Sequence, residues 1–360
     1  MLKDYYRLWS TAYGRSALLS TTVLLMLGVL SCSADDELTR AERTAVIEEL
    51  ATTLRSYYVF PNVGEQYAEM LGKNLEQGSY DEFVDRKNFA ERVTKDLKSL
   101  HEDRHLSLKD LATHQETMAE LKSSIGRKEA DDPPRDVTQA ENMTEFSDLG
   151  TDSNNSHHGF KTVKMIQEKI AYIELNLFPE SPQAVGRAHE VMQSITDATA
   201  IIFDIHQHRG GGTQVIDAIV SYLFDERTHM VTMMTRNRDD DRVMEHVSQP
   251  NEMSGLFSGK PVYLLTSRKT GSAAEHFAGA LKFTKRATLV GEPTAGAGHF
   301  GTNVPIADHF VAFIPYGRTY DPATGKDWEA VGVQPDVPVE ASVALETVLN
   351  MIDAAPDQRK

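Results

Sequence analysis

The chain has a single cysteine, Cys32, among its 360 residues. A lone cysteine excludes an intrachain disulfide, and it also excludes a zinc site built from several cysteines. Positive charge is scarce as well, because 37 Lys and Arg stand against 53 Asp and Glu, which gives a formal net charge of −16. This balance argues against nucleic-acid binding and against contact with an anionic membrane through a basic face.

A long apolar stretch occurs near the N-terminus. Lys3, Arg7 and Arg15 precede an apolar segment over residues 17–30, which is too short to span a bilayer comfortably. We therefore interpret residues 1–32 as a signal segment. The sequence Val-Leu-Ser-Cys over residues 29–32 resembles a bacterial lipobox, in which Cys32 is lipidated; ordinary cleavage after Ala34 is the alternative. Both predict an exported protein, in the periplasm or cell envelope of a bacterium. Lipidation of Cys32 further predicts membrane contact, and only through the lipid anchor.

The rest of the chain divides into segments of different pattern. Residues 36–115 carry apolar residues at helical spacing over 41–58, 64–77 and 87–100, which predicts a small N-terminal helical domain. Residues 116–158 are polar and indicate a linker. Residues 159–345 alternate buried strands with helices, which predicts an α/β domain with a mostly parallel sheet, and residues 346–360 are left as a C-terminal tail.

The most informative junction of the α/β segment contains Ser272. An unbroken apolar run over 261–267 predicts a buried strand, and residues 272–282 have helical spacing. A serine at the start of a helix lies beside free backbone N–H groups and the positive end of the helix dipole, which suits a nucleophile. The alternative is structural: Ser272 caps the helix, and Glu275 completes a capping box.

Three other segments carry residues suited to chemistry. His105 lies in a polar turn after a helix and is either a general base or a surface histidine. Gly210 and Gly211 follow a buried strand and form either an oxyanion site or a tight turn. Glu329 precedes a Gly/Pro turn and either orients a histidine or is solvated. His206 and His208 are a possible metal pair, although a third ligand is not evident.

Taken in order, these motifs resemble a known family. The series runs His105, Gly210-Gly211, Ser272, then Gly-Glu-Pro-Thr-Ala-Gly over 291–296, then Glu329 with Gly-Val-Gln-Pro-Asp over 332–336. It resembles the tail-specific (C-terminal processing) serine peptidases, in the branch similar to interphotoreceptor retinoid-binding protein. The resemblance implies a crotonase-like (ClpP/crotonase-type) α/β catalytic domain, a polypeptide substrate, and neither a cofactor nor a metal.

The resemblance also implies roles for single residues. Ser272 matches the nucleophile, and Ala297 stands where many relatives have a lysine base. A Ser–His–Glu triad of Ser272, His105 and Glu329 is therefore implied, with the oxyanion held by the N–H groups of Ala273 and of Gly210 or Gly211. If His105 is not the base, His299 and His276 are the next candidates. The competing hypothesis is a non-catalytic carrier of hydrophobic ligands on the same fold.

Overall fold

The computed structural model describes residues 37–114, 157–167, 169–236 and 241–354. The signal segment and almost all of the predicted linker lie outside these residues. The described residues from Glu37 onward belong to one compact unit. No helix within the described residues is both long and apolar enough to cross a membrane.

The N-terminal part of this unit contains three helices. They are α2 (Arg40–Tyr57), α3 (Pro61–Glu76) and α4 (Arg86–Leu100), close to the ranges expected from apolar spacing. Local sequence explains where they begin. Thr39 and Glu42 form a capping box before α2, and Asp85 accepts a hydrogen bond from the backbone of Asn88 to cap α4. Pro61 opens α3, where its missing N–H has no consequence.

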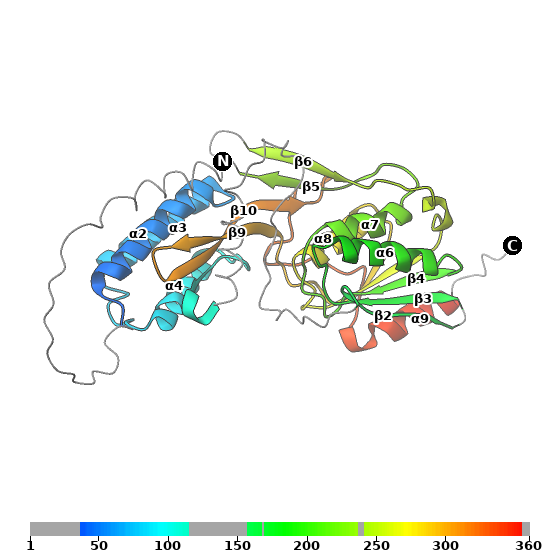
Figure 1. The fold of residues 1–360 in the computed structure, drawn as a ribbon, viewed down its shortest axis with the longest axis horizontal. Coiled ribbons are helices and arrows are strands. Elements are labelled where there is room, and N and C mark those ends of the chain that lie inside the picture. The colour runs from blue at the N-terminus through cyan, green and yellow to red at the C-terminus, as the bar shows by residue number, and fades with distance from the viewer. Residues whose placement is uncertain (1–36, 115–156, 168, 237–240, 355–360) are drawn as a thin grey trace, which may run out of the picture. The chain divides into compact units, whose positions relative to one another are not determined.

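These helices do not form an independent bundle. They pack against a five-stranded antiparallel sheet of β1 (Ser107–Asp110), β10 (Phe310–Tyr320), β9 (His299–Ile306), β5 (His229–Thr235) and β6 (Arg242–Val247) (Figure 1). One apolar core joins Leu54 and Phe89 of the helices to Phe310 and Ile314 of β10. The helical segment therefore shares its core with strands that lie about 200 residues later in the sequence. The sequence predicted one mostly parallel sheet, and the structure has this antiparallel sheet in addition.

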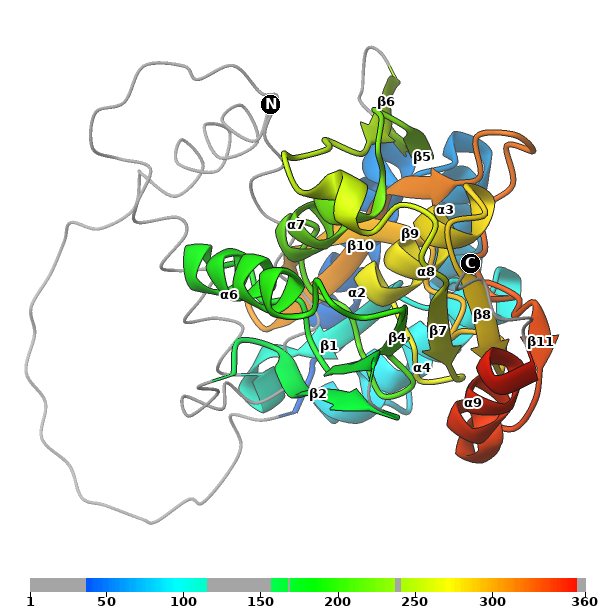
Figure 2. The ribbon, with the colours of Figure 1, turned by 90° about the vertical axis from the view of Figure 1, so that its right-hand side faces the viewer.

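The second sheet has six strands in the order β11-β8-β7-β4-β3-β2. Their bounds are β2 (Phe160–Ile166), β3 (Ile170–Leu175), β4 (Ala200–Asp204), β7 (Val262–Thr266), β8 (Thr288–Gly291) and β11 (Val337–Pro338). All neighbouring pairs are parallel except β2 with β3. Strands β4 and β7 are buried along their whole length, as their unbroken apolar runs predict. Figure 2 shows β4, β7, β8 and β11 following one another in this order.

Helices cover both faces of the parallel sheet. On one face lie α6 (Pro182–Ser194), α7 (Gln214–Leu223) and α8 (Ala273–Phe283), and on the other lies α9 (Ala344–Ala354) (Figure 1). Helix α9 occupies much of the predicted tail, and Ala344 and Val348 bury against the sheet. Short 3-10 helices occupy Leu111–His114, Ser254–Leu256 and Ala341–Val343. The parallel strands β4 and β7 point their carboxyl ends to one edge, which places the turns after them side by side.

Candidate active site

Ser272 lies at the turn between β7 and α8. Its backbone has φ 53° and ψ −123°, although an ordinary helix cap has extended φ and ψ. A non-glycine residue in this region is strained and persists only where the surroundings enforce it. The carboxylate half of the capping box suggested by the sequence is present, because the Ser272 N–H donates to Glu275 Oε2 at 2.9 Å. The turn thus caps the helix and holds Ser272 in an unusual conformation.

Glu275 fixes this turn to the loop that follows β8. Its buried carboxylate also accepts hydrogen bonds from Thr294 Oγ1 at 2.6 Å, Gly296 N at 2.7 Å and Ala297 N at 2.8 Å. Burial raises the pKa of Glu275, and these hydrogen bonds oppose the rise. The Gly-Glu-Pro-Thr-Ala-Gly segment is therefore held beside Ser272 by one carboxylate.

The glycine turn after β4 lies against Ser272. A Cβ built on Gly210 would come within 2.8 Å of Ser272 Cβ and 3.3 Å of Ala273 N, so this close approach requires glycine. The Gly210 N–H donates to His208 Nδ1 at 3.1 Å, so this N–H is used by a hydrogen bond within the turn. The N–H groups of Gly211 and Ala273 donate to no other described residue. Of the three predicted oxyanion donors, these two remain available.

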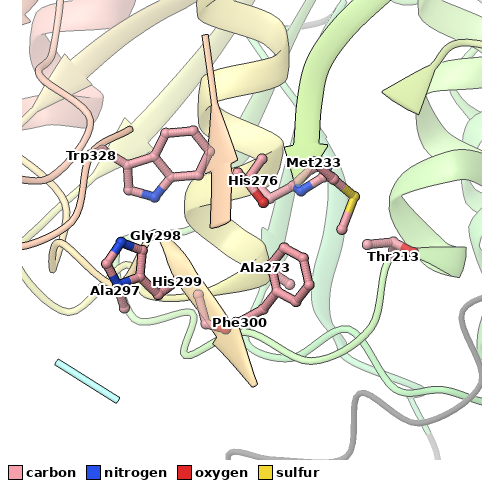
Figure 3. Close-up of a pocket in the computed structure, with 11 residues that line it drawn as sticks. Thr213, Met233, Ala273, His276, Ala297, Gly298, His299, Phe300 and Trp328 are labelled. Carbon is pink, nitrogen blue, oxygen red and sulfur yellow. The ribbon is translucent and has the colours of Figure 1, made fainter. Parts of the chain in front are cut away.

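A pocket opens beside Ser272. The space is about 320 Å³ including its mouth, and its lining comes from α8, β5, β9, β10 and the segments that connect these and other elements. The lining residues are Thr213, Met233, Ser272, Ala273, His276, Ala297, Gly298, His299, Phe300, Thr319 and Trp328. Figure 3 shows His299 on the same side as Trp328 and Gly298, and His276 beside Met233. Two buried nitrogens on this lining, His299 Nε2 and Trp328 Nε1, have no hydrogen-bond partner among the described residues.

His299 belongs to a buried acidic cluster. Its Nδ1 lies 2.7 Å from Asp103 Oδ2 and 3.8 Å from Glu329 Oε2, and its Nε2 lies 3.8 Å from Asp327 Oδ2. Burial lowers the pKa of His299, but the carboxylates of Asp103, Asp327 and Glu329 outweigh burial and raise this pKa to about 10. Burial disfavours the Asp103 anion, yet the hydrogen bond from His299 holds the pKa of Asp103 below its usual value.

Comparison with known proteins agrees with this geometry. The family model described as peptidase family S41 matches residues 169–339, and the model for its N-terminal domain in eukaryotic interphotoreceptor retinoid-binding protein matches residues 37–147. The chain belongs to peptidase family S41. The resemblance to C-terminal processing peptidases that the motifs predicted is confirmed. The match of the N-terminal region confirms the predicted similarity to interphotoreceptor retinoid-binding protein.

Curated relatives of this S41 chain are C-terminal processing peptidases. The chloroplastic enzyme of Tetradesmus obliquus is 29% identical over 195 residues, 53% of this chain and 40% of the relative. Peptidase 2 of Arabidopsis thaliana is 28% identical over 175 residues, 48% of this chain and 32% of the relative. The S41 chain therefore spans less than half the length of these relatives. A solved structure of a putative peptidase from Parabacteroides merdae has the same fold, with a TM-score of 0.59, 17% identity, and coverage of 88% of this chain and 99% of that one.

The S41 fold brings some of the predicted residues together and separates others. Ser272 and Ala273 line the pocket, but within the described residues the lining does not include His105. The His105 ring is buried and stacks on Phe313 of β10, with ring centroids 5.3 Å apart. Burial lowers the pKa of His105 to about 4, so its ring is neutral at ordinary pH. Its role as the base stays a prediction.

Glu329 lies close to the pocket but contacts backbone. Its Oε1 accepts from Arg104 N at 2.7 Å, and its Oε2 accepts from Gly298 N at 2.7 Å and His299 N at 2.9 Å. Burial and the charge of Asp103 raise the pKa of Glu329, and His299 opposes the rise. Glu329 thus connects the segment after α4 to the start of β9. The imidazole that lies close to its carboxylate is that of His299, at 3.8 Å.

The residues best placed for a metal are Asp103, His299 and Glu329, whose candidate ligand atoms lie within 4.8 Å of one another. Their atoms are engaged in hydrogen bonds to each other and to backbone, which favours a hydrogen-bonded network. His206 and His208 do not converge. His206 hydrogen-bonds Asp204, whereas His208 is fully buried on Phe178, where burial lowers its pKa to about 3. Cys32 lies outside the described residues.

Asp103 was not among the predicted site residues, and His299 was predicted only as an alternative base to His105. Asp103 lies two positions before His105, and only the histidine of this turn was interpreted as a functional residue. His299 directly follows Gly298, at the end of the loop that adjoins the nucleophile turn. Its contact with Asp103 bridges 196 positions, and spacing along the sequence gives no signal for such a pair.

Proposed function

We propose that this chain is an exported serine peptidase that hydrolyses peptide bonds with Ser272 as the nucleophile. One observation carries the proposal: Ser272 is held at φ 53° on a strained strand-to-helix turn that faces a pocket lined by histidine. Strain at such a turn exposes the hydroxyl and is retained at functional sites. Family membership supports the same chemistry.

The oxyanion of the tetrahedral intermediate would be held by backbone. The N–H of Ala273 opens α8, where the helix dipole favours negative charge, and the N–H of Gly211 is the second donor. Gly210 contributes by letting its turn approach Ser272, because a side chain at this position would clash. Removing one such donor from an acyl-transfer enzyme typically costs on the order of 10²–10³ in kcat.

The base is a histidine, since Ala297 replaces the lysine of many relatives. The motif order assigns His105 as this base and Glu329 as the residue that orients it. A neutral His105 suits proton abstraction, and Glu329 contacts the segment that carries it through Arg104 N. This assignment requires the His105 ring, which stacks on Phe313, to come within hydrogen-bond reach of Ser272. The nucleophilic role of Ser272 does not depend on which histidine serves.

The remaining features of the proposal concern substrate and location. The names of the curated relatives suggest that a polypeptide is the substrate, and the parallel sheet with helices on both faces is consistent with a crotonase-like catalytic domain. The apolar segment before Cys32 supports export with a lipid anchor. These inferences rest on the sequence and on family membership.

The test is hydrolysis of an unstructured protein substrate by the purified chain and by Ser272→Ala. We expect a loss on the order of 10³-fold or more with an unchanged melting temperature, because alanine keeps the turn and removes the hydroxyl. Residual turnover above about a few per cent would contradict the nucleophile. A wild-type chain that binds hydrophobic ligands and hydrolyses nothing would support the carrier instead.

A further inference from the structure

We infer that the pocket beside Ser272 selects a substrate side chain that ends in a primary amide, and that Trp328 and His276 hold this amide. Glutamine and asparagine carry such a side chain, here on the residue whose carbonyl carbon Ser272 attacks. The inference rests on the proposed serine peptidase activity and specifies the substrate of that site. It follows from one unpaired donor and one unpaired acceptor on the lining of the pocket.

Trp328 supplies the donor. The residue is 3% exposed, and its Nε1 is buried with no hydrogen-bond partner among the described residues. The N–H of an indole only donates, and a buried donor without an acceptor is costly. Because Trp328 lines the pocket together with Ser272, an oxygen atom of a bound substrate would supply the missing acceptor.

Two glycines define how the indole ring lies. A Cβ on Gly279 of α8 would lie 3.4 Å from Cζ3 of Trp328, at the six-membered end of the ring, where Phe283 also packs with ring centroids 6.0 Å apart. A Cβ on Gly298 would lie 3.2 Å from Nε1. Figure 3 shows the indole nitrogen on the edge of the ring toward Gly298. The absence of a side chain at Gly298 therefore leaves the N–H edge of the indole open toward the pocket.

His276 supplies the acceptor through a chain of hydrogen bonds. Nε2 of His246 on β6 lies 2.6 Å from Oδ1 of Asp217 on α7, and because a carboxylate only accepts, this nitrogen carries a proton. Nδ1 of a neutral His246 then accepts from His276 Nε2, which lies 2.6 Å away. In the neutral His276 ring the remaining nitrogen, Nδ1, has a lone pair and accepts.

The surroundings of His276 keep its ring neutral. Burial lowers the pKa of His276, and the neighbouring His246 lowers it further. Nδ1 of His276 hydrogen-bonds none of the described residues, and His276 lines the pocket four positions after Ser272. Asp217 and His246 are therefore positioning residues, which set the nitrogen of His276 that carries the proton.

The lining suits an amide better than a charged or an apolar side chain. The lining residues in the described part of the chain include no Asp, Glu, Lys or Arg. A lysine of the substrate would meet no carboxylate there, and it would meet the positive charge of His299, whose pKa is raised to about 10. A glutamate carboxylate would face the lone pair of His276 Nδ1.

An apolar side chain would leave both polar atoms of the pocket without a partner, at a cost in binding. A primary amide satisfies both, because its oxygen accepts from Trp328 Nε1 and its N–H donates to His276 Nδ1. The two threonine hydroxyls on the lining either donate or accept, so they do not discriminate between these side chains.

The experiment digests a peptide library with the purified chain and maps the cleavage sites by mass spectrometry. It then compares kcat/KM for two peptides that differ only in glutamine or methionine before the scissile bond, because methionine has a similar length and lacks the amide. The variants are Trp328→Phe, which removes the N–H, and Asp217→Asn, which no longer requires the proton of His246 on Nε2. Tyr263→Phe, outside the pocket lining, is the matched control. Each variant is checked for its melting temperature.

A second measurement follows the Trp328 N–H itself. The chain has two tryptophans, so Trp9→Phe leaves Trp328 alone. In a Ser272→Ala chain with this change, isotope-labelled tryptophan gives a single indole N–H resonance. The glutamine peptide should move its proton signal downfield with saturation, because the N–H gains an acceptor. The methionine peptide should not.

We expect glutamine and asparagine to be enriched before the scissile bond. The glutamine peptide should exceed the methionine peptide by about 10–100-fold in kcat/KM, at about tenfold for each hydrogen bond. Trp328→Phe and Asp217→Asn should each lower this ratio about tenfold, and Tyr263→Phe should leave it unchanged.

A ratio near one in the wild-type chain, or an unchanged ratio in Trp328→Phe, would overturn the inference. An unchanged ratio in Asp217→Asn would refute His276 as the acceptor. Cleavage without a preference for an amide counts against this inference alone, whereas a wild-type chain that cleaves no more than Ser272→Ala counts against the serine peptidase itself.

Discussion

His299 Nδ1 lies 2.7 Å from Asp103 Oδ2, and these residues are 196 positions apart in the chain. Asp103 follows α4 and His299 begins β9, so the contact joins the helical segment to the antiparallel sheet. Ser272 comes from a third place, the turn after β7 of the parallel sheet. The candidate site therefore forms only when the helical segment and both sheets pack together.

Glu275 should matter more for stability than an ordinary surface glutamate. Glu275→Ala leaves the buried donors Thr294 Oγ1, Gly296 N and Ala297 N without an acceptor, at about 1–3 kcal/mol for each unsatisfied group. We expect urea unfolding to show a loss of at least about 3 kcal/mol, and a smaller loss for Glu275→Gln, which keeps one oxygen. The exposed Glu69→Ala on α3 is the control. A loss below about 1 kcal/mol for Glu275→Ala would contradict this role.

The free energy of unfolding should decrease below pH 6.5. Burial lowers the pKa of His105 to about 4 and of His208 to about 3, and it lowers that of His276 as well. Between these values and 6.5 the unfolded chain binds more protons than the folded chain, so stability falls as pH falls. The slope is about 1.4 kcal/mol per pH unit for each such histidine.

His299 should act in the opposite direction at higher pH. With its folded pKa raised to about 10, its contribution is complete below 6.5 and is lost as pH rises through 10. The histidines together thus favour greatest stability near pH 6.5. Urea titrations at pH 5, 6.5 and 9 measure both limbs, and His208→Asn should make the acid limb shallower. Equal stability at all three pH values would contradict these environments.

Cys32 should decide where the exported protein is found. Cys32→Ala should move the mature chain from the membrane fraction to the soluble exported fraction, because an acyl chain contributes about 0.8 kcal/mol per buried CH₂. Ser33→Ala is the matched control and should stay with the membrane. A wild-type chain that is already soluble and begins at Asp35 would show cleavage after Ala34 and rule out the anchor.

Local sequence patterns predicted the elements with strong periodicity. The strand predicted over 261–267 is β7 (Val262–Thr266), and the buried strand predicted before Gly210 is β4 (Ala200–Asp204). Both could be predicted because buried parallel strands form unbroken apolar runs. Helix α8 could also be predicted, because its apolar residues have helical spacing and Glu275 marks its first turn. Strand β6 was missed because it is largely exposed, and α9 because its apolar residues fall at the end of the chain.

The site was predictable where its residues sit in a motif. Ser272 and its turn could be found because a buried strand, a glycine and a capping pair are contiguous. Asp103 and His299 could not be paired, since their contact depends on how β9 packs beside the segment after α4. The orientation of His105 toward Phe313 is likewise set by tertiary packing, and a polar turn in the sequence does not reveal it.

The most direct test of the account is covalent labelling of the purified protein by a fluorophosphonate, followed by mass mapping of the modified peptide. The account predicts one phosphonylated serine, Ser272, and no labelling of Ser272→Ala, which should melt like the wild-type chain. An unlabelled wild-type chain, or a label that falls on another serine and persists in Ser272→Ala, would contradict the assignment of Ser272 as the nucleophile.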